Sequence, residues 1–349
     1  MRAFITGVNG HLGSALVPIL QEKGWKISGL VRKTSNRAAI KDFKIDLLYG
    51  DIADLASFKE AAQGCEAIFH LAAPTTVRTE KDRDSVKKGI LNICALAQQQ
   101  SSFKRIVYVS SSVTVGVVDS SQKELDEETF MDLSGTPYQR LKNEAEQMIS
   151  RLARDYGLDI VIVNPSTIVG SGDFRPTPPN QLIVNFLNCA GSWRWLRGPE
   201  LKAAPVWFDT GFSIVGVSDA ARGLYRAYEK GRSRERYILG GDNITLYQFY
   251  KTLSKLTGLP APGLYLPRSA MFVASWLLTK LLEHPPLSYS LAKTMVGKYA
   301  FFSSRKAQQE LGYEWQPHES VLKNAVSWFL QTELIREERK AIIRDYGLG

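Results

Sequence analysis

Tyr138 and Lys142 are the residues whose types and spacing point most directly to chemistry. They lie four positions apart, on one face of the helix that the pattern predicts from residue 138 to about 156, and Pro137 suits the start of that helix. A phenol with a pKa of about 10 is a poor acid–base group at neutral pH, but a nearby ammonium lowers that pKa toward the working range. The pair is therefore suited to moving a proton to or from a bound molecule.

Three consecutive serines, Ser110, Ser111 and Ser112, follow a predicted strand at Arg105–Val109. A hydroxyl group at the end of that strand could hold a carbonyl oxygen beside Tyr138, with hydride coming from a nicotinamide. A tyrosine and a lysine at this spacing also occur by chance on solvated amphipathic helices. The catalytic interpretation therefore depends on whether the chain builds a dinucleotide site.

The N-terminal residues predict such a site. A strand at Arg2–Thr6 and a helix over residues 12–23 flank Gly7, Gly10 and Gly13, at the spacing G-x-x-G-x-x-G. In a dinucleotide-binding βαβ unit, such glycines allow the tight turn, the approach of a pyrophosphate to the backbone and the packing of helix on strand. The phosphates would lie against free N–H groups at the helix N-terminus.

Arg32 follows the second predicted strand, Lys26–Val31, about 20 residues after the glycine-rich turn. Sites that prefer NAD usually carry Asp or Glu there, to bond the ribose 2′-hydroxyl. A planar guanidinium with a permanent charge suits a 2′-phosphate instead. Arg32 therefore favours NADP(H) over NAD(H); the alternative is that it only joins Lys33 and Arg37 in a surface cation cluster.

Further predicted strands alternate with helices and complete the fold. The strands cover residues 45–49, 66–71 and 159–163, and the helices cover 54–62 and 81–100. This alternation predicts an α/β fold with a doubly wound parallel sheet, which binds its ligand at the carboxyl ends of the strands. We expect a dinucleotide-binding domain at 1–165 and a smaller α/β substrate lobe at 166–349, of which about 206–242 returns to pack on the first domain.

The second half of the chain is expected to set the substrate. A loop over residues 170–180 would cover the nicotinamide, and the aromatic and basic stretch 191–205 could form either a substrate wall or the core of the lobe. Residues 269–282 are strongly apolar but too few to span a membrane, so they could lie on a membrane, contact a partner or pack within the lobe. A last helix is expected at 320–335, with 336–344 extending it into solvent.

Composition narrows the classes of function. The 349 residues carry a formal net charge of +9, but the basic residues are spread out without a nucleic-acid motif, so no nucleic-acid partner is expected. The three cysteines and four histidines are scattered without metal-ligand spacing, so no metal site is expected. The chain begins at once with a strand, which predicts no signal peptide and a cytoplasmic location. Whether the protein is a monomer or a homodimer stays open.

Short motifs typical of one family are spread along the whole chain. They are Thr6-Gly7-x-x-Gly10-x-x-Gly13, Gly50-Asp51, His70-Leu71-Ala72-Ala73, Tyr108-Val109-Ser110-Ser111-Ser112, Tyr138-x-x-x-Lys142, Asn164-Pro165-Ser166, Val217-Ser218-Asp219 and Phe302-Ser303-Ser304-Arg305-Lys306-Ala307. On these motifs the chain resembles an extended short-chain dehydrogenase/reductase of the NAD-dependent epimerase/dehydratase family. The pair Val31-Arg32 at the end of the second predicted strand resembles the pair found there in the dihydroflavonol-4-reductase-like branch. The sequence of residues 162–178 resembles that of proteins named hopanoid-associated sugar epimerases.

The resemblance implies a Rossmann domain that binds NADP(H), with Ser112, Tyr138 and Lys142 as the catalytic group. It implies cofactor contacts for Thr6, Gly7, Asn9, Gly10, His11, Leu12, Gly13, Arg32, Asp51, Ile52, Leu71, Ala72, Ala73, Tyr138, Lys142, Pro165, Ser166 and Thr167. It implies substrate contacts for Thr75, Ser112, Val113, Asp173, Phe174 and Trp207.

Two departures from the family pattern bear on the activity. Leu141 stands where many members have serine, and we interpret it as a packing residue. Val86 stands where epimerases and dehydratases usually carry asparagine, which favours a reductase that converts a ketone or aldehyde into an alcohol. A nucleotide-sugar epimerase or dehydratase and a non-catalytic NADP-binding sensor stay as alternatives. The expected partner is a small carbonyl compound or alcohol, and a hydrophobic one would suit the apolar segment 269–282.

Overall fold

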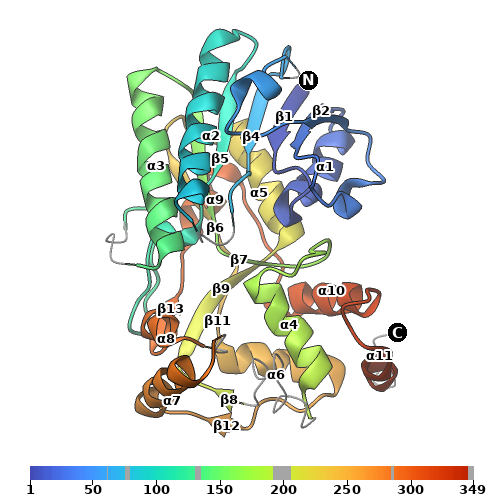
Figure 1. The fold of residues 1–349 in the computed structure, drawn as a ribbon, viewed down its shortest axis with the longest axis vertical. Coiled ribbons are helices and arrows are strands. Elements are labelled where there is room, and N and C mark those ends of the chain that lie inside the picture. Colours follow the sequence, from blue (N-terminus) through green and yellow to red (C-terminus); the bar gives the residue numbers. More distant parts are fainter. Residues whose placement is uncertain (61, 75–78, 130–134, 192–205, 284–286, 345–349) are drawn as a thin grey trace.

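The computed structural model describes residues 1–60, 62–74, 79–129, 135–191, 206–283 and 287–344. It has two lobes arranged end to end, with the larger sheet in one lobe and a smaller sheet with its own helices in the other (Figure 1). Among the helices that these residues form, none is long and apolar enough to cross a membrane.

The larger lobe is built on a seven-stranded sheet with the strand order β10-β6-β5-β4-β1-β2-β3, in which every neighbouring pair is parallel. The strands are β1 (Arg2–Thr6), β2 (Lys26–Val31), β3 (Asp46–Tyr49), β4 (Ala67–His70), β5 (Arg105–Val109), β6 (Ile160–Pro165) and β10 (Arg236–Leu239). The order reverses between β1 and β4, the switch point at which doubly wound sheets bind ligands. The predicted Rossmann-type α/β fold is confirmed.

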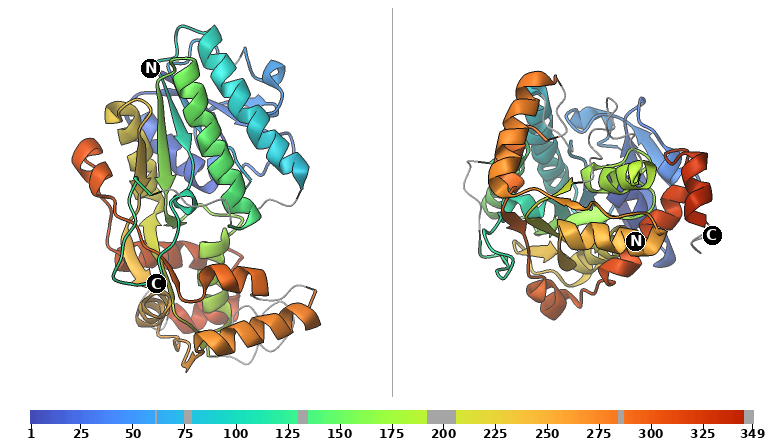
Figure 2. Two further views of the ribbon diagram at one scale, coloured as in Figure 1. Left: turned by 90° about the vertical axis from the view of Figure 1, so that its left-hand side faces the viewer. Right: turned by 90° about the horizontal axis from the view of Figure 1, so that it is seen from below.

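Helices cover both faces of this sheet (Figures 1 and 2). One face carries α1 (His11–Glu22), α5 (Val217–Lys230) and α9 (Arg305–Leu311), and the other carries α2 (Glu80–Gln99) and α3 (Pro137–Asp155). Adjacent strand residues point to opposite faces, so Ile5 packs in the core with α1 and α5, whereas Phe4 packs in the core with α2 and α3. Burial on both faces explains why β1 is apolar at consecutive positions.

The smaller lobe contains a second, four-stranded sheet. Strand β9 (Thr210–Gly216) pairs with β7 (Thr167–Val169), β11 (Asp242–Thr245) and β13 (Lys298–Ala300). A separate core lies between this sheet and the helices α4 (Pro178–Cys189), α6 (Leu246–Thr257) and α10 (His318–Leu330). The lobe also contains the strand pair β8 (Val206–Trp207) and β12 (Leu264–Tyr265), and the helices α7 (Arg268–Leu281), α8 (Tyr289–Met295) and α11 (Glu337–Arg344).

The predicted helix over residues 54–62 is wrong, because the chain forms only a short 3₁₀ turn at Leu55–Ser57. The Asp54 side chain caps this turn, and the Ser57 hydroxyl bonds the backbone carbonyls of Asp51 and Asp54. Side-chain bonds of this kind compete for the backbone groups that a longer helix would use.

The C-terminal segment also differs from its prediction of one helix with a solvated tail. Helix α10 ends at Leu330, and α11 forms a separate helix packed against the lobe. Arg339 is 7% exposed and donates hydrogen bonds to the carbonyl oxygens of Leu187 and Ala190, at 2.8 and 2.7 Å. These carbonyls lie at the end of α4, where the helix itself offers no partner. The charged segment therefore caps a helix instead of extending into water.

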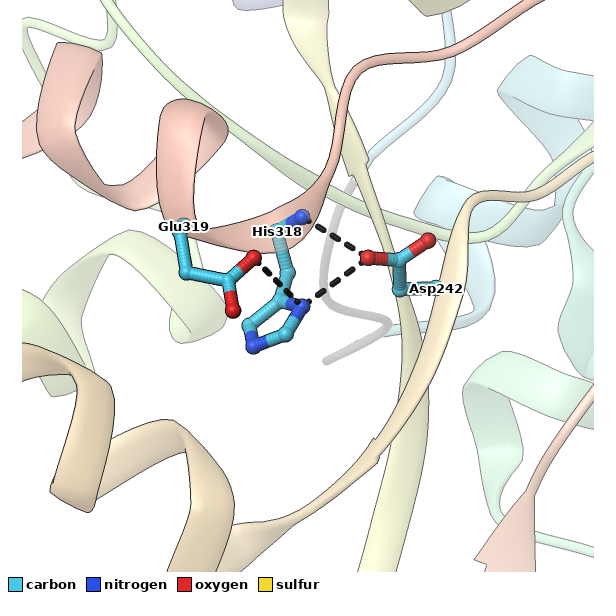
Figure 3. Close-up of side chains that lie close together, drawn as sticks. All are labelled: Asp242, His318 and Glu319. Carbon is cyan, nitrogen blue, oxygen red and sulfur yellow. Dashed lines mark hydrogen bonds and ion pairs between the residues drawn. The ribbon is translucent and has the colours of Figure 1, made fainter.

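Asp242, in β11, anchors the start of α10 (Figure 3). Its Oδ2 accepts the His318 N–H at 2.8 Å and lies 2.9 Å from His318 Nδ1, while its Oδ1 accepts the Trp315 Nε1–H at 2.9 Å. Glu319 Oε2 lies 3.2 Å from the same Nδ1. Burial works to raise the pKa of Asp242, but the hydrogen bonds from His318 and Trp315 outweigh it and leave that pKa below its ordinary value. We interpret this cluster of side chains as a helix cap.

Candidate active site

The glycine-rich turn joins β1 to α1 at the switch point of the main sheet. Gly7 has a left-handed φ of +73°, and a Cβ atom there would lie 2.9 Å from the backbone nitrogen of Ala72. A Cβ atom on Gly13 would lie 2.2 Å from the carbonyl oxygen of Gly7. Gly10 caps α1 without a side-chain hydrogen bond, so N–H groups at the helix start remain for an anion. The turn therefore has the geometry that its sequence predicts.

Thr6 ties this turn to the end of β4. Its Oγ1 accepts the Ala72 N–H at 3.2 Å and lies 2.7 Å from His70 Nδ1. Burial, helped by the charge of Lys142, lowers the pKa of His70 to about 3, so the ring is neutral and its Nδ1 can accept the threonine proton. His70 is thus a packed core residue, and Thr6 holds the Ala72 backbone against the turn.

A cavity of about 1660 Å³ extends from the glycine-rich turn into the smaller lobe. It exceeds the roughly 300–1,000 Å³ of sites for drug-sized ligands, so a dinucleotide and a substrate could share it. The predicted residues that line it are Asn9, Gly10, His11, Arg32, Ala73, Tyr138 and Thr167 from the cofactor set, and Ser112, Val113, Asp173 and Phe174 from the substrate set. The structure thus brings the dinucleotide motif and the tyrosine helix to one space.

The other predicted residues are not among those that line the cavity. These are Thr6, Gly7, Leu12, Gly13, Asp51, Ile52, Leu71, Ala72, Lys142, Pro165 and Ser166, while Thr75 falls outside the described residues. Ile52 packs on α2, where a Cβ atom on Gly89 would lie 3.0 Å from Ile52 Cγ1. Asp51 Oδ1 accepts the Ala53 N–H at 2.9 Å. These two residues therefore shape the loop after β3.

Trp207, predicted to contact substrate, turns away from the cavity. Its ring centroid lies 4.7 Å from that of Tyr247 and 4.6 Å from that of Tyr265. Its neighbours Val206 and Phe208 line the cavity instead. Alternation along an extended chain explains this arrangement, because adjacent side chains point to opposite sides.

Arg32 stands at the rim of the cavity with its side chain exposed. Asn9, in the glycine-rich turn, donates from Nδ2 to the carbonyl oxygen of Asn36 at 2.9 Å and so ties the loop after β2 to the turn. Arg37 behaves differently, since it bonds the Tyr49 hydroxyl and lies over that ring. Of these two arginines, only Arg32 lines the cavity.

Tyr138 and Lys142 lie on one face of α3, which begins at Pro137 with a reciprocal hydrogen-bonded cap. Lys142 is 6% exposed, and its Nζ donates to the carbonyl oxygen of Val109, at the end of β5, over 3.4 Å. Burial lowers the pKa of Lys142 to about 8, while the charge of Glu146 opposes that shift. The lysine is therefore held behind the tyrosine, close to the end of the sheet.

The Tyr138 side chain is hydrogen-bonded to the Ser111 side chain. Burial raises the pKa of Tyr138, and the Ser111 hydrogen bond opposes the rise. This differs from the expectation that Lys142 lowers that pKa. Ser112, the serine predicted to be catalytic, is 5% exposed and lines the cavity. Ser111 therefore contacts the phenol, and Ser112 lines the same cavity as Tyr138.

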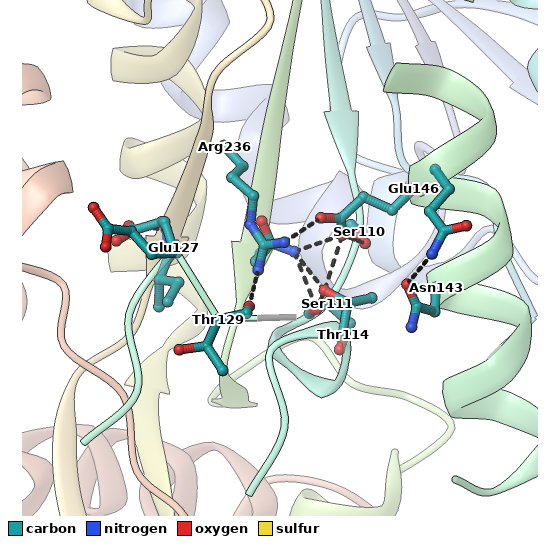
Figure 4. A network of polar contacts seen from close by, with 12 residues as sticks. Ser110, Ser111, Thr114, Glu127, Thr129, Asn143, Glu146 and Arg236 are labelled. Atoms are coloured by element: carbon teal, nitrogen blue, oxygen red, sulfur yellow. Dashed lines mark hydrogen bonds and ion pairs between the residues drawn. The ribbon is translucent and has the colours of Figure 1, made fainter. Parts of the chain in front are cut away.

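Glu146, one turn beyond the lysine, connects the ends of three strands (Figure 4). Its Oε2 accepts hydrogen bonds from Ser110 Oγ at 2.5 Å, Thr114 Oγ1 at 2.9 Å and Asn164 Nδ2 at 2.8 Å. Its Oε1 lies 3.0 Å from Nη1 of Arg236, in an ion pair with both side chains buried. This network fixes the serine turn after β5 from behind.

His11 connects the glycine-rich turn to the loop after β7. Its Nε2 lies 3.0 Å from the Ser171 carbonyl oxygen, and its Nδ1 lies 3.8 Å from Asp173 Oδ2. Burial lowers the pKa of His11 against the opposing charge of Asp173. Asp173 Oδ2 also accepts bonds from the Thr177 N–H and hydroxyl, both at 2.7 Å, and from Asn180 Nδ2 at 2.8 Å. Asp173 therefore holds this loop over the cavity through its Oδ2.

Sequence reasoning missed Glu146 and Arg236. Glu146 continues the four-residue spacing of Tyr138 and Lys142, which places it on the same face of the helix and is the signal that could have found it. Arg236 gives no such signal, because its partner lies on an element distant in the sequence.

The comparisons with known proteins agree with this geometry. The NAD dependent epimerase/dehydratase family matches residues 3–240. A putative dihydroflavonol 4-reductase from Synechocystis sp. is 34% identical over 340 residues, covering 93% of this chain and 94% of that protein. Sterol demethylase protein B from Methylococcus capsulatus is 29% identical over 344 residues, covering 96% and 100%. The crystal structure of gox2253 has a TM-score of 0.82 and 31% identity, covering 96% of this chain and 99% of that one. The chain therefore belongs to the NAD-dependent epimerase/dehydratase family of extended short-chain dehydrogenases/reductases, which bind a nicotinamide dinucleotide.

Proposed function

We propose that this protein is an NADP(H)-dependent oxidoreductase that reduces a ketone or aldehyde to an alcohol. The observation that carries the proposal is that Tyr138, whose pKa is raised by burial, lines the same cavity as Arg32 and the glycine-rich turn. A protonated phenol can donate a proton to a carbonyl oxygen, whereas oxidation of an alcohol requires the phenolate. Tyr138 is therefore protonated at neutral pH, which is the form that reduction uses.

The residues at the glycine-rich turn fit an NADP(H) molecule. Gly7 and Gly13 have no room for side chains, which keeps the backbone open to a pyrophosphate. The exposed guanidinium of Arg32 would bind a 2′-phosphate. The Ser166 hydroxyl is buried and has no hydrogen-bond partner within the described residues, so it is available to a polar group of the cofactor. When bound, the cofactor would supply the hydride.

The side chains of the protein would handle the proton and the carbonyl oxygen. Tyr138 would donate its proton to that oxygen as the alcohol forms, and Ser112 would hold the oxygen beside the phenol. Lys142 would stabilise the negative charge that Tyr138 gains, and it would also hold the ribose hydroxyls of the cofactor. Positioned donors of this kind act mainly by stabilising charge that develops in the transition state.

The lining of the smaller lobe supports a hydrophobic substrate. The part of the cavity away from the glycine-rich turn is lined mainly by apolar side chains, among them Phe208, Phe212, Met271, Leu278 and Leu291. A nucleotide sugar would bring two phosphate charges and many hydroxyl groups to this wall, at a cost in unpaired polar groups. A polycyclic ketone of sterol size fits it better, and one relative at 29% identity is named sterol demethylase protein B.

The test is a screen of carbonyl compounds that follows NADPH oxidation, with wild type and Tyr138→Phe assayed in parallel. We expect turnover of apolar ketones by wild type and a loss of about 10²-fold or more in the variant, because general acid catalysis contributes on that order. Turnover without added cofactor, together with NAD retained through purification, would instead identify an epimerase or dehydratase. NADPH binding without turnover of any carbonyl compound would support a sensor.

A further inference from the structure

Helix α7 has an apolar outer face. Val273, Trp276, Leu277 and Leu281 are 59, 47, 44 and 76% exposed, and their spacing places them on one side of the helix. Only Met271 and Ser275 of this helix are buried. Scattered exposed apolar residues are ordinary, but a contiguous stripe of large ones on one helix marks a contact surface.

The opposite face of α7 belongs to the cavity wall. Met271, Ala274, Ser275 and Leu278 line the cavity, and Leu291 of α8 lines it while remaining 39% exposed on the outside. Packing within the lobe therefore explains only the inner face, because no described residue covers the outer stripe. Figures 1 and 2 place α7 at the end of the molecule farthest from the seven-stranded sheet, where a flat surface could approach it.

Cations paired with aromatic rings lie within and beside the stripe. Lys280 Nζ lies 5.3 Å from the centre of the Trp276 ring, Lys293 Nζ lies 4.6 Å from that of Tyr289, and the Arg268 guanidinium carbon lies 5.6 Å from that of Phe272. Lys280, Lys293 and Arg268 are exposed. Tryptophan and tyrosine favour the boundary between headgroups and acyl chains, and lysine and arginine extend their charges toward anionic headgroups. The net charge of +9 acts in the same direction.

We propose that α7 and α8 dock the protein on the surface of a bilayer that contains anionic phospholipid. The 14 residues of α7 span about 21 Å, at about 1.5 Å per residue, which is shorter than the hydrocarbon core of about 30 Å. The helix would therefore lie in the plane of the interface, with its outer stripe among the acyl chains and Lys280 and Lys293 at the headgroups. This inference does not depend on the proposed reductase activity.

The experiment is co-sedimentation of the full-length protein with vesicles of phosphatidylcholine alone, or of phosphatidylcholine with added phosphatidylglycerol. We expect binding to the mixed vesicles that weakens with salt. The affinity of the double variant Trp276→Ser, Leu281→Ser for these vesicles should fall by at least about tenfold, because two large apolar side chains are lost from the interface. Lys280→Glu with Lys293→Glu should remove the preference for phosphatidylglycerol.

The matched control is Leu91→Ser, which removes a 46% exposed leucine from α2, in the other lobe, and should leave vesicle binding unchanged. Circular dichroism and NADPH binding check that every variant is folded. Absence of wild-type binding to the mixed vesicles, or equal binding by the double variant, would overturn the proposal. Sedimentation velocity tests whether a second copy of the chain covers this face instead. If the wild type is a dimer and the double variant is a monomer, the face is a subunit interface and the proposal is overturned.

Discussion

Glu146 Oε1 lies 3.0 Å from Arg236 Nη1, and this ion pair joins α3 to β10 behind the predicted catalytic group. The same carboxylate bonds Ser110 and Thr114 through its other oxygen, so one buried acid holds both the end of the sheet and the serine turn. Since α3 also carries Tyr138 and Lys142, the pair fixes the serine and tyrosine elements relative to one another. Glu146 is thus a positioning residue that does not itself line the cavity.

Glu146→Gln should lower the free energy of unfolding by about 3 kcal/mol, because loss of one partner leaves the other charge of a buried ion pair uncompensated. It should also lower kcat more than it changes KM, since the substrate wall is untouched. Urea unfolding and steady-state kinetics measure the two effects. Glu144→Gln, on the same helix, removes a partly exposed ion pair with Lys87 at 3.7 Å and should cost less than about 1 kcal/mol. Equal effects of the two substitutions would contradict the positioning role.

Lys142 should set the alkaline limit of the reduction rate. Burial lowers the pKa of Lys142 to about 8, so its charge is present below pH 8 and is lost as the pH rises through that value. A neutral Lys142 no longer stabilises the negative charge that develops on Tyr138, so the rate should fall above pH 8. Lys142→Arg keeps its charge throughout and should remove this limb from the pH profile, provided that circular dichroism shows the variant folded.

The pH dependence of stability separates this effect from unfolding. The folded pKa of Lys142 lies below that of the unfolded chain, about 10.4, so the unfolded state binds more protons between about pH 8 and 10. This group therefore makes the protein more stable as the pH rises through that window. A fall in rate that tracks a fall in unfolding free energy above pH 8 would count against the assignment.

Arg32→Asp should weaken NADPH binding far more than NADH binding, by about tenfold or more, because a 2′-phosphate would lose its guanidinium partner and meet a carboxylate. Titration of protein fluorescence with each cofactor measures both affinities. Arg37→Asp makes the same charge change beside Tyr49, outside the cavity lining, and should affect the two cofactors alike. An equal loss of NADPH and NADH in Arg32→Asp would show that Arg32 does not bind the 2′-phosphate.

Gly7→Ala should abolish dinucleotide binding or folding, because its Cβ would lie 2.9 Å from the Ala72 nitrogen at a φ of +73°. Gly24 provides a control with nearly the same backbone, since its φ is +74° and no atom lies within 4 Å of its Cβ position. Gly24→Ala should therefore show only the conformational strain, about 1 kcal/mol. The difference between the two melting temperatures then measures the steric clash at the turn.

The sequence predicted the elements whose signals are local. The strand at Arg2–Thr6, the glycines after it and the helix that carries Tyr138 could all be placed, because periodicity, turn chemistry and capping act over a few residues. The helix predicted over residues 54–62 was wrong for an equally local reason. The Asp54 and Ser57 side chains hydrogen-bond to backbone groups that a longer helix would use. Capping residues at a helix start also suit a short turn.

Features set by distant partners could not be predicted in this way. The charged segment that includes Arg339 was predicted to extend into solvent. The carbonyl oxygens that accept the hydrogen bonds of Arg339 lie at the end of α4, far away in the sequence, so no local pattern indicates them. The resemblance to the family implied a substrate contact for Trp207, but its side of the strand depends on how β8 pairs with β12. The pKa of Tyr138 depends on its burial in the folded protein, which no i,i+4 spacing reveals.

Substitution of Ser111 and Ser112 by alanine should separate two roles that the sequence assigned to one residue. The Ser111 side chain is hydrogen-bonded to Tyr138, and its Oγ also accepts the Val113 N–H at 3.4 Å, whereas Ser112 lines the cavity. If Ser112 holds the carbonyl oxygen, Ser112→Ala should lower kcat by about 10²-fold, as loss of one such donor typically does, with an unchanged pH profile. Ser111→Ala should instead raise the pKa of Tyr138, because the bond that opposes the effect of burial is lost. In the Lys142→Arg background, which lacks the limb set by Lys142, the alkaline limb of the pH profile should therefore move upward, with a smaller change in kcat. Kinetics of both variants across the pH range distinguish these outcomes. A larger loss of kcat in Ser111→Ala, with no movement of the profile, would transfer the carbonyl contact from Ser112 to Ser111.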